Sequence, residues 1–193
     1  MAFYTDDELA DLGLGRFGEN VLISRKSSLY NPGDISLGSN VRIDDFCVLS
    51  AGEGGIEIGD YVHIAVYSSL IGTGRIRICD FCNISSRVSI YSSNDDYSGR
   101  SMTNPMVPAR FKSVQVDDVF FGKHVIVGSG SVILPGVTLE EGVAIGALSL
   151  VKASCAAFGI YAGGRQVGER SRDLLDLEAR LLSGQGAPEN GEA

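Results

Sequence analysis

Several residue types are scarce in this 193-residue chain, which has two histidines, no tryptophan, five prolines and four cysteines. So few prolines exclude a collagen-like chain or a Pro/Gly-rich disordered chain. Four cysteines in a chain of this length do not make a disulfide scaffold. The composition therefore predicts an ordinary globular protein that folds around an apolar core.

Basic residues and long hydrophobic runs are also scarce. The chain has 16 Lys and Arg against 24 Asp and Glu, a net charge of −8, which argues against nucleic acid or an anionic membrane as the main partner. An anionic small molecule held by a few local cations remains compatible with this balance. The longest charge-free stretch, 125–139, is shorter than a membrane span and contains glycine and proline. No basic residue precedes Arg16, so we expect no signal peptide, no membrane insertion and a cytoplasmic location.

Glycine, in contrast, is abundant at 25 residues, and the chain is periodic. Large apolar residues stand six places apart, a spacing that fits neither an amphipathic helix nor a single alternating strand. A period of six fits a solenoid in which each hexapeptide is a short strand plus a corner, with three hexapeptides in each triangular coil. The repeating residues are Phe17/Ile23/Leu29, Leu37/Ile43/Leu49, Ile58/Ile64/Leu70, Ile78/Ile84/Ile90, Phe121/Val127/Ile133 and Leu139/Ile145/Val151.

The position four places after each large apolar residue supports this interpretation. Wherever no insertion follows, it is occupied only by Val, Ser or Cys, as expected for a side chain that points inward at a crowded corner. The next position after the large residue is often glycine, for example Gly38 and Gly128, which suits a tight corner with close backbone approach. The extra residues between triplets all fall at one of the three corners, where a long external loop of about 91–118 also leaves the solenoid.

The sequence divides into four segments. We expect a capping helix within 1–16, a β-solenoid of about six coils over 17–152, a C-terminal extension with a helix over 153–183, and a disordered tail over 184–193. Thr5 and Glu8 form a capping-box pattern. A second helix, from about Ser171 to Leu182, has leucines on one face and is expected to cap the other end of the solenoid.

These residues resemble the hexapeptide-repeat acyltransferases. The likeness covers roughly 17–170, and the segment 122–139, GKHVIVGSGSVILPGVTL, is a strong match. It looks closest to the branch that acetylates sugars, such as galactoside and maltose acetyltransferases. The resemblance implies a left-handed parallel β-helix, a homotrimer with active sites between neighbouring prisms, and acetyl-CoA as the donor for a sugar or nucleotide-linked amino sugar, in surface polysaccharide biosynthesis.

Acetyl transfer to a hydroxyl needs a general base, and the resemblance places a histidine in the long loop for this role. Here Asp95 stands at that position instead. A carboxylate with an ordinary pKa is a weak base unless it is perturbed, and the adjacent Asp96 could raise its pKa. The two aspartates could instead only cap a turn. An amine acceptor needs a weaker base than a hydroxyl. The replacement of the loop histidine by Asp95 therefore favours N-acetylation over O-acetylation, and both remain open.

Other candidate acceptor-site residues flank this loop or lie within it. His63 ends its hexapeptide and stands above Asn83 of the next coil, and it is the second candidate catalytic residue after Asp95. The candidate substrate contacts are Asn83, Arg87, Asp96 and Tyr97. Arg87 could bind a phosphate or carboxylate of the substrate, or pair with Asp95. His124 is expected to point outward, as a solvated or interface residue.

The resemblance also places the coenzyme. Pantetheine lies along the last coils in this family, where Ser129, Ala147 and Lys152 match contacting positions. The family's Gly-Asn-Pro-Ala-Lys motif is replaced by Ala162-Gly163-Gly164-Arg165, so Arg165 would take over the phosphate contact of the motif lysine. No metal is expected, since Cys82 and Cys47 fall at inward core positions and Cys79-x-x-Cys82 is a lone pair.

Two alternatives share the same solenoid. A γ-type carbonic anhydrase needs three histidines per zinc, and this chain has two. A non-catalytic trimeric scaffold would keep the solenoid and lose the long loop. The retained loop, with its acidic cluster, favours an enzyme because long loops on rigid scaffolds usually carry function.

Overall fold

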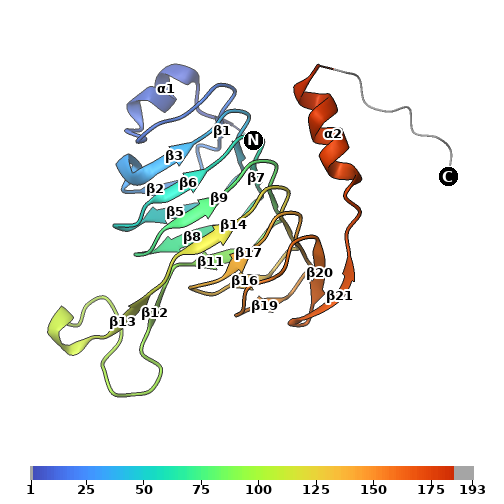
Figure 1. Ribbon diagram of the computed structural model, residues 1–193. Helices are drawn as coiled ribbons and strands as arrows, with labels where there is room; N and C mark the ends of the chain where they lie inside the picture. Colours follow the sequence, from blue (N-terminus) through green and yellow to red (C-terminus); the bar gives the residue numbers. More distant parts are fainter. Residues whose placement is uncertain (1, 185–193) are drawn as a thin grey trace.

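The computed structural model describes residues 2–184, which form a parallel β-solenoid with three flat faces (Figure 1). Successive turns pair strand on strand in parallel register, so the six-residue period becomes three stacked sheets. The fold predicted from the repeat is confirmed. The solenoid has about seven turns, one more than predicted, because β20 (Gly159–Ala162) pairs in parallel with β18 and continues the stack.

The three faces are numbered in the order in which the chain enters them. Face 1 consists of β1 (Leu22–Ile23), β4 (Arg42–Ile43), β7 (His63–Ile64), β10 (Asn83–Ile84), β15 (Ile126–Val127), β18 (Ala144–Ile145) and β20, with β21 (Arg165–Glu169) antiparallel at its edge. Face 2 consists of β2 (Ser28–Tyr30), β5 (Val48–Ala51), β8 (Ser69–Gly72), β11 (Ser89–Tyr91), β16 (Val132–Ile133) and β19 (Leu150–Val151). Face 3 consists of β3 (Ile35–Leu37), β6 (Ile56–Ile58), β9 (Ile76–Ile78), β14 (Val119–Phe121) and β17 (Thr138–Leu139).

The core is a column of aliphatic side chains along the solenoid axis. From Ile23 to Val151 every residue of the six-place repeat is buried except Leu29, which is partly buried. The small inward residues are buried as well, with the exception of Ser27, and Cys47 and Cys82 are among them. The core interpretation of these two cysteines is therefore confirmed.

The glycines that follow the aliphatic residues serve the close approach of successive turns. A Cβ added to Gly38 would lie 2.6 Å from the carbonyl carbon of Gly59 on the next turn. Gly38 and its equivalents do not have positive φ among the described residues; the left-handed positions lie elsewhere at the corners and are mostly not glycine. They include Asn40, Tyr61, Phe81 and His124 before face 1, and Phe46, Tyr67, Arg87 and Leu148 between faces 1 and 2.

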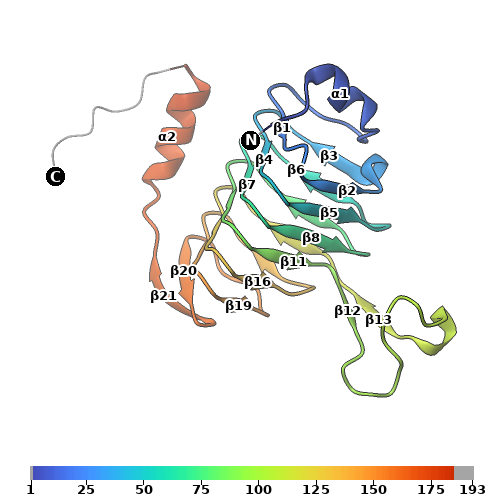
Figure 2. The same ribbon diagram turned by 180° about the vertical axis from the view of Figure 1, so that it is seen from behind.

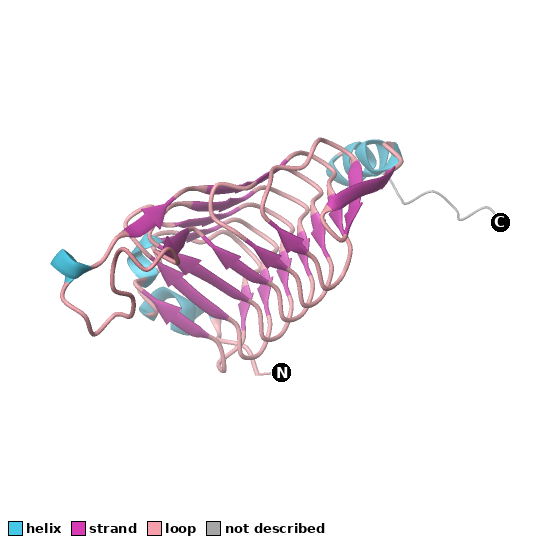
Figure 3. Cartoon of the chain, turned by 90° about the horizontal axis from the view of Figure 1, so that it is seen from below, coloured by secondary structure: helices cyan, strands magenta, loops and turns pink. Residues whose placement is uncertain are grey.

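The insertions all leave the corner between faces 2 and 3. The first contains the short 3₁₀ helix η1 (Pro32–Asp34), and the longest forms an arm that projects from the prism (Figure 3). We define the arm as residues 93–116: its base is an antiparallel hairpin of β12 (Ser93–Asp95) and β13 (Val114–Val116), and η2 (Ala109–Phe111) lies farther out.

The two ends of the chain differ. At the N-terminus, α1 (Asp6–Asp11) begins with the predicted capping box, in which Thr5 and Glu8 bond reciprocally, and Leu9 is buried in the core. At the other end, α2 (Asp173–Leu182) does not cap the solenoid, which corrects our expectation. Figures 1 and 2 show it running back along the outside of the prism.

Neither helix within residues 2–184 is long and apolar enough to cross a membrane. The predicted tail lies, apart from Gly184, outside the described residues.

Candidate active site

A buried carboxylate holds a histidine beside the corner between faces 1 and 2. Asp44 follows β4 and is only 5% exposed. Its Oδ2 lies 2.9 Å from Nε2 of His63 on the next turn, and its Oδ1 accepts a hydrogen bond of 2.8 Å from Nε of Arg42. The imidazole of His63 is about 40% exposed. The solenoid thus presents an oriented histidine to the outside.

Polar groups continue along this corner on the following turns. Asn83 lies in register with His63, as predicted. Ser86 Oγ is 3.3 Å from Ser129 Oγ, and a Cβ added to Gly128 would lie only 2.4 Å from the backbone nitrogen of Ala147. Six residues of successive turns, on face 1 and at the corner that follows it, form what we call the corner strip. It consists of Asp44, His63, Asn83, Ser86, Ser129 and Ala147.

Arg87 belongs to a stacked column beside the corner strip. Its guanidinium lies 5.5 Å from the centroid of the Tyr67 ring, Tyr67 stacks on Phe46 at 4.9 Å, and Lys26 lies over the other side of Phe46. Across residues 2–184, no ion pair joins Arg87 to Asp95, so the alternative of a structural pair between them is wrong. The stacking holds the guanidinium at the protein surface.

The second part of the candidate site is the base of the arm. Asp95 ends β12, is exposed, and pairs across the hairpin with Val114. Beside it lies a hollow of about 480 Å³, lined by the arm and also by Tyr91, Val132 and Leu134 at the edge of face 2. Asp95 also borders a second hollow of about 340 Å³ on the arm itself. The carboxylate is therefore placed between two concave surfaces.

The carboxylate of Asp96 is bound within its own turn. Its Oδ1 accepts a hydrogen bond of 2.8 Å from the backbone nitrogen of Ser98. The side-chain and backbone hydrogen bonds from Ser98 hold the pKa of Asp96 below its ordinary value. Asp96 thus caps the turn that contains Tyr97, whose side chain is almost fully exposed.

The corner strip and Asp95 lie at opposite edges of face 2. The strand β11 separates Arg87, which precedes it, from the arm, which follows it. Five residues of extended chain from Arg87 to Ser92 span about 16 Å at the usual rise per residue. One chain therefore does not bring Asp95 to His63 directly.

The remaining predicted coenzyme residues, Lys152 and Arg165, lie at the C-terminal end of the solenoid. Lys152, Ser149 and Gly164 line a hollow of about 130 Å³. The segment Ala162-Gly163-Gly164-Arg165 is a two-residue hairpin turn in which both glycines have positive φ. Arg165 lies at the start of β21 with its side chain in solvent, close in the chain to the hollow that Lys152 lines.

His124 is not solvated, and this corrects the sequence-based expectation. Its ring is stacked on Phe81 with centroids 5.0 Å apart, and its side chain is 10% exposed. Glu178 of α2 covers it, with Oε2 at 2.6 Å from Nε2, and also accepts a hydrogen bond of 2.9 Å from Lys123. The repeat could not reveal Glu178 as the partner, because helical periodicity shows the apolar face of α2 but not its docking site.

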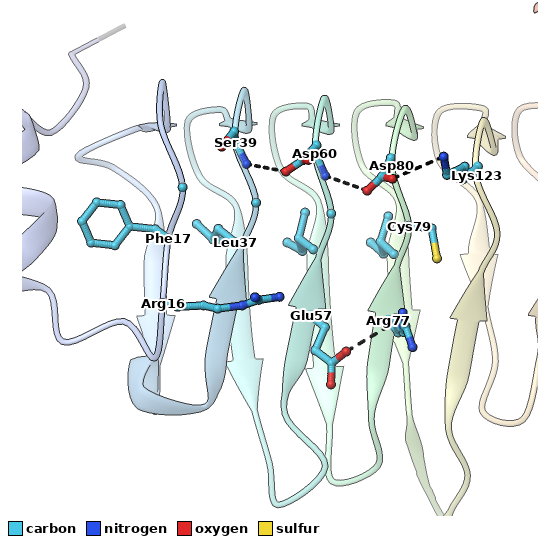
Figure 4. Close-up of a pocket in the computed structure, with 15 residues that line it drawn as sticks. Arg16, Phe17, Leu37, Ser39, Glu57, Asp60, Arg77, Cys79, Asp80 and Lys123 are labelled. Carbon is cyan, nitrogen blue, oxygen red and sulfur yellow. Dashed lines mark hydrogen bonds and ion pairs between the residues drawn. The ribbon is translucent and has the colours of Figure 1, made fainter. Parts of the chain in front are cut away.

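A further groove of about 550 Å³ crosses face 3 and the corner before face 1 (Figure 4). Backbone nitrogens of successive turns donate to aspartates along it, Ser39 to Asp60 at 2.7 Å and Asp60 to Asp80 at 2.9 Å. Lys123 ends the row at 3.6 Å from Asp80. These carboxylates are already used to join one turn to the next, so the groove is explained by the packing of the solenoid.

The four cysteines are all free. Burial raises the pKa of Cys82 to about 12 and that of Cys47 to about 11, so both are neutral thiols at physiological pH. Across residues 2–184, no group of three or more His, Cys, Asp or Glu side chains is arranged to hold a metal ion.

Comparisons with known proteins place this geometry among acyltransferases. No family model matches the chain. An Escherichia coli dTDP-4-amino-4,6-dideoxy-D-glucose acyltransferase is 56% identical over 181 residues, covering 93% of this chain and 94% of that protein. The putative lipopolysaccharide biosynthesis O-acetyl transferase WbbJ of Escherichia coli K12 is 30% identical over 149 residues, 70% of each chain.

Solved structures of AntD, an N-acyltransferase from Bacillus cereus, have the same fold over nearly the whole chain. The complex with dTDP and 3-hydroxybutyryl-CoA is 46% identical with a TM-score of 0.88, covering 94% of this chain and 97% of AntD. A serine variant of AntD bound to dTDP-4-amino-4,6-dideoxyglucose and coenzyme A is 45% identical with a TM-score of 0.91, covering 95% and 99%. The more similar relatives are thus acyltransferases of amino sugars rather than of neutral sugars.

Proposed function

This chain belongs to the hexapeptide-repeat acyltransferases, and we propose that it moves an acyl group from coenzyme A to the amine of a dTDP-linked amino sugar. The high identity to an acyltransferase of dTDP-4-amino-4,6-dideoxy-D-glucose, over nearly the whole chain, is the observation that carries the proposal. Acetyl-CoA is the donor that the sequence predicts. The AntD complex with 3-hydroxybutyryl-CoA makes a longer acyl group the first alternative to test.

An amine acceptor fits the carboxylate at the base of the arm. At neutral pH a sugar amine is largely protonated and must lose a proton before its nitrogen can attack a thioester. A general base positioned beside it speeds such a step by about 10²–10⁴-fold. Asp95, placed between two hollows, and His63, held by Asp44, are the groups that we propose for proton transfer.

The separation of these two groups supports an active site shared between copies of the chain. Face 2 carries no charged side chain at its outward positions from β2 to β16. These positions are Ser28, Tyr30, Val48, Ser50, Ser69, Ile71, Ser89, Tyr91, Val132 and Leu134. Face 3, in contrast, carries Glu57 within 4 Å of Arg75 and Arg77. An uncharged face next to an incomplete site is typical of an interface.

We propose a homotrimer in which face 2 of each prism packs near the corner strip of the next. Such a head-to-tail contact closes a ring when three copies meet. It would set Asp95 of one chain against His63 and Asn83 of its neighbour. Arg87, held by Tyr67, would receive a phosphate of the acceptor, and Asp96 and Tyr97 would line the same space from the arm.

The coenzyme would lie along the same corner toward the C-terminal end. Ser129 and Ala147 would contact pantetheine, and Lys152 and Arg165 are the proposed partners of its phosphates. All four cysteines are free, which is consistent with the reducing cytoplasm as the place of action. The relationship to WbbJ supports a role in surface polysaccharide biosynthesis.

Co-assembly of two inactive variants tests the shared site. Asp95→Asn and His63→Gln should each lower kcat at least tenfold, because each removes a proton-transfer group. Chains co-expressed in equal amounts should recover about one quarter of the wild-type rate, since one in four random contacts joins an intact arm to an intact corner. No recovery, with normal trimer mass, would place both groups in one chain's site. A change below threefold in Asp95→Asn would remove Asp95 from proton transfer.

A further inference from the structure

We propose that Asp44 is the positioning residue for His63, which it fixes as the tautomer that leaves Nδ1 free to take a proton from the acceptor. This rests on the proposed function, in which an amine attacks a thioester. Asp44 is identified by its burial and by its two hydrogen bonds.

The environment of Asp44 leaves its carboxylate little freedom. Only 5% of the residue is exposed, and the two oxygens have different partners. Oδ1 accepts from Nε of Arg42 at 2.8 Å, and Oδ2 faces Nε2 of His63 at 2.9 Å. Arg42 and His63 lie in register on neighbouring strands, so the β-ladder itself fixes the spacing of the three side chains.

The tautomer of His63 follows from this contact. An ionised carboxylate only accepts hydrogen bonds, so Nε2 of His63 must carry the proton that joins it to Asp44. The neutral ring then has its lone pair on Nδ1. A carboxylate that orients a histidine in this way also stabilises the imidazolium that forms when Nδ1 gains a proton.

The other histidine shows what a purely structural contact looks like here. His124 is also bound to a carboxylate through Nε2, but its ring is stacked on Phe81 and only 10% of its side chain is exposed. His63 leaves about 40% of its side chain open and lies on the corner strip, in register with Asn83. Of the two, His63 alone combines an oriented ring with access to a ligand.

The exposed carboxylate of Asp95 from the neighbouring chain accepts the proton that the ammonium form of the acceptor must lose, and passes it to solvent. Nδ1 of His63 then takes a second proton from the acceptor nitrogen as that nitrogen forms a bond to the thioester carbon. The carbon–sulfur bond then breaks and its electron pair goes to sulfur. The imidazolium returns the proton to the sulfur, which gives an amide and the free thiol of coenzyme A. Asp44 stays ionised throughout and holds the ring.

Histidine NMR tests the positioning without any need for turnover. The protein contains only two histidines, so ¹⁵N-histidine labelling gives two rings, and a His124→Gln variant assigns them. At a pH where both rings are neutral, His63 should show the Nε2–H tautomer in the wild-type protein. Asp44→Asn should shift it toward the Nδ1–H tautomer, because an amide can donate to Nε2. Asp45→Asn is the matched control, since Asp45 bonds to Ser24 and Lys26.

Steady-state kinetics supplies the second readout. Asp44→Asn should lower kcat at least tenfold with the KM for acyl-CoA changed less than twofold, and Asp45→Asn should keep the wild-type kcat. An unchanged His63 tautomer, or an unchanged kcat despite a changed tautomer, would overturn the proposal. If His63 has the expected tautomer but the wild-type protein transfers no acyl group to any amine, the proposed function fails instead. His63→Gln, at an exposed position, provides the low-activity reference if Asp44→Asn folds poorly.

Discussion

Glu178 of the C-terminal helix accepts a hydrogen bond of 2.6 Å from His124, five turns along the solenoid from its beginning. Lys123 donates to the other oxygen of the same carboxylate at 2.9 Å. Arg170 reaches the carbonyl oxygens of His124 and Gly142 at 2.7 and 3.1 Å, just before the helix begins. These contacts fasten α2 to the side of the prism, although none of its residues is buried.

Removal of this carboxylate should loosen α2 alone. Glu178→Gln weakens two charge-assisted hydrogen bonds, each of a kind that contributes about 1.5–3 kcal/mol. Amide exchange in α2 should become at least tenfold faster by hydrogen–deuterium exchange, with the core strands unchanged. Asp176→Asn, an exposed change on the same helix, is the control. Equal exchange in wild type and Glu178→Gln would mean that other contacts hold the helix.

The same contact should depend on pH. Burial acts to raise the pKa of Glu178, but the hydrogen bonds from Lys123 and His124 outweigh it and leave the pKa below its ordinary value. A lowered pKa means that the carboxylate stabilises the folded state above the ordinary pKa of Glu and loses this effect as pH falls below it. The protection factors of the α2 amides, measured against their intrinsic exchange rates at each pH, should therefore fall on acidification in the wild type and change less in Glu178→Gln.

The N-terminal capping box should show a pH dependence of its own. Hydrogen bonds from Arg25 and then from Thr5 lower the pKa of Glu8 to about 2. Its contribution is complete above pH 4.5 and is lost as pH falls toward 2. Glu8→Gln should lower the Tm at pH 7, and this deficit should shrink steadily between pH 4.5 and 2. A deficit that stays constant over this range would contradict the assigned contact.

Substitution by glycine should have different effects on the Tm at two residues whose backbone is left-handed. Leu148 has φ 57° and is 85% exposed, so Leu148→Gly relieves backbone strain at little cost in packing. We expect an unchanged or higher Tm. His124 has φ 60°, but His124→Gly also removes the stack on Phe81 and the contact with Glu178. Its Tm should fall, and a rise in Tm would show that backbone strain exceeds these contacts.

The close approach of successive turns should forbid a methyl group at Gly38. A Cβ there would lie 2.2 Å from Oδ1 of Asp60 and 2.6 Å from the carbonyl carbon of Gly59, and backbone cannot yield as a flexible side chain can. Gly38→Ala should lower the Tm by several degrees. Gly13→Ala is the comparison variant. Nothing lies within 4 Å of the Cβ position of Gly13, so any fall in its Tm comes from the left-handed backbone (φ 73°) and not from crowding. Equal stability of Gly38→Ala and wild type would contradict the packing of the turns.

Most of the fold could be predicted from the sequence because the same core contact recurs in every turn of the repeat. Ile84 stacks on Ile64 and Val127 for the same reason that Ile43 stacks on Ile23, so one rule places the whole core. The non-repeating end did not follow from this rule. Pairing of β20 with β18 and the return of α2 to His124 depend on contacts that occur once in the chain.

The candidate site, like the fold, could be predicted only where it follows the repeat. His63 above Asn83 follows from the period of the repeat and is seen in the structure. Asp44, which contacts His63, could not be recognised from the sequence. The residue that follows the aliphatic position varies from turn to turn, and the repeat does not show which of these residues is buried or bonded to Arg42. Asp96 was expected to perturb its neighbour, but Ser98 two residues later uses its carboxylate instead.

The acceptor assay tests the central claim most directly. The protein is incubated with acetyl-CoA or 3-hydroxybutyryl-CoA and either dTDP-4-amino-4,6-dideoxyglucose or dTDP-glucose, and thiol release and product mass are followed. We predict stoichiometric release of coenzyme A and an amide product with the amino sugar, and at least a hundredfold slower reaction with the hydroxyl compound. No acyl transfer to the amine with either donor, or equal rates with both acceptors, would contradict the account.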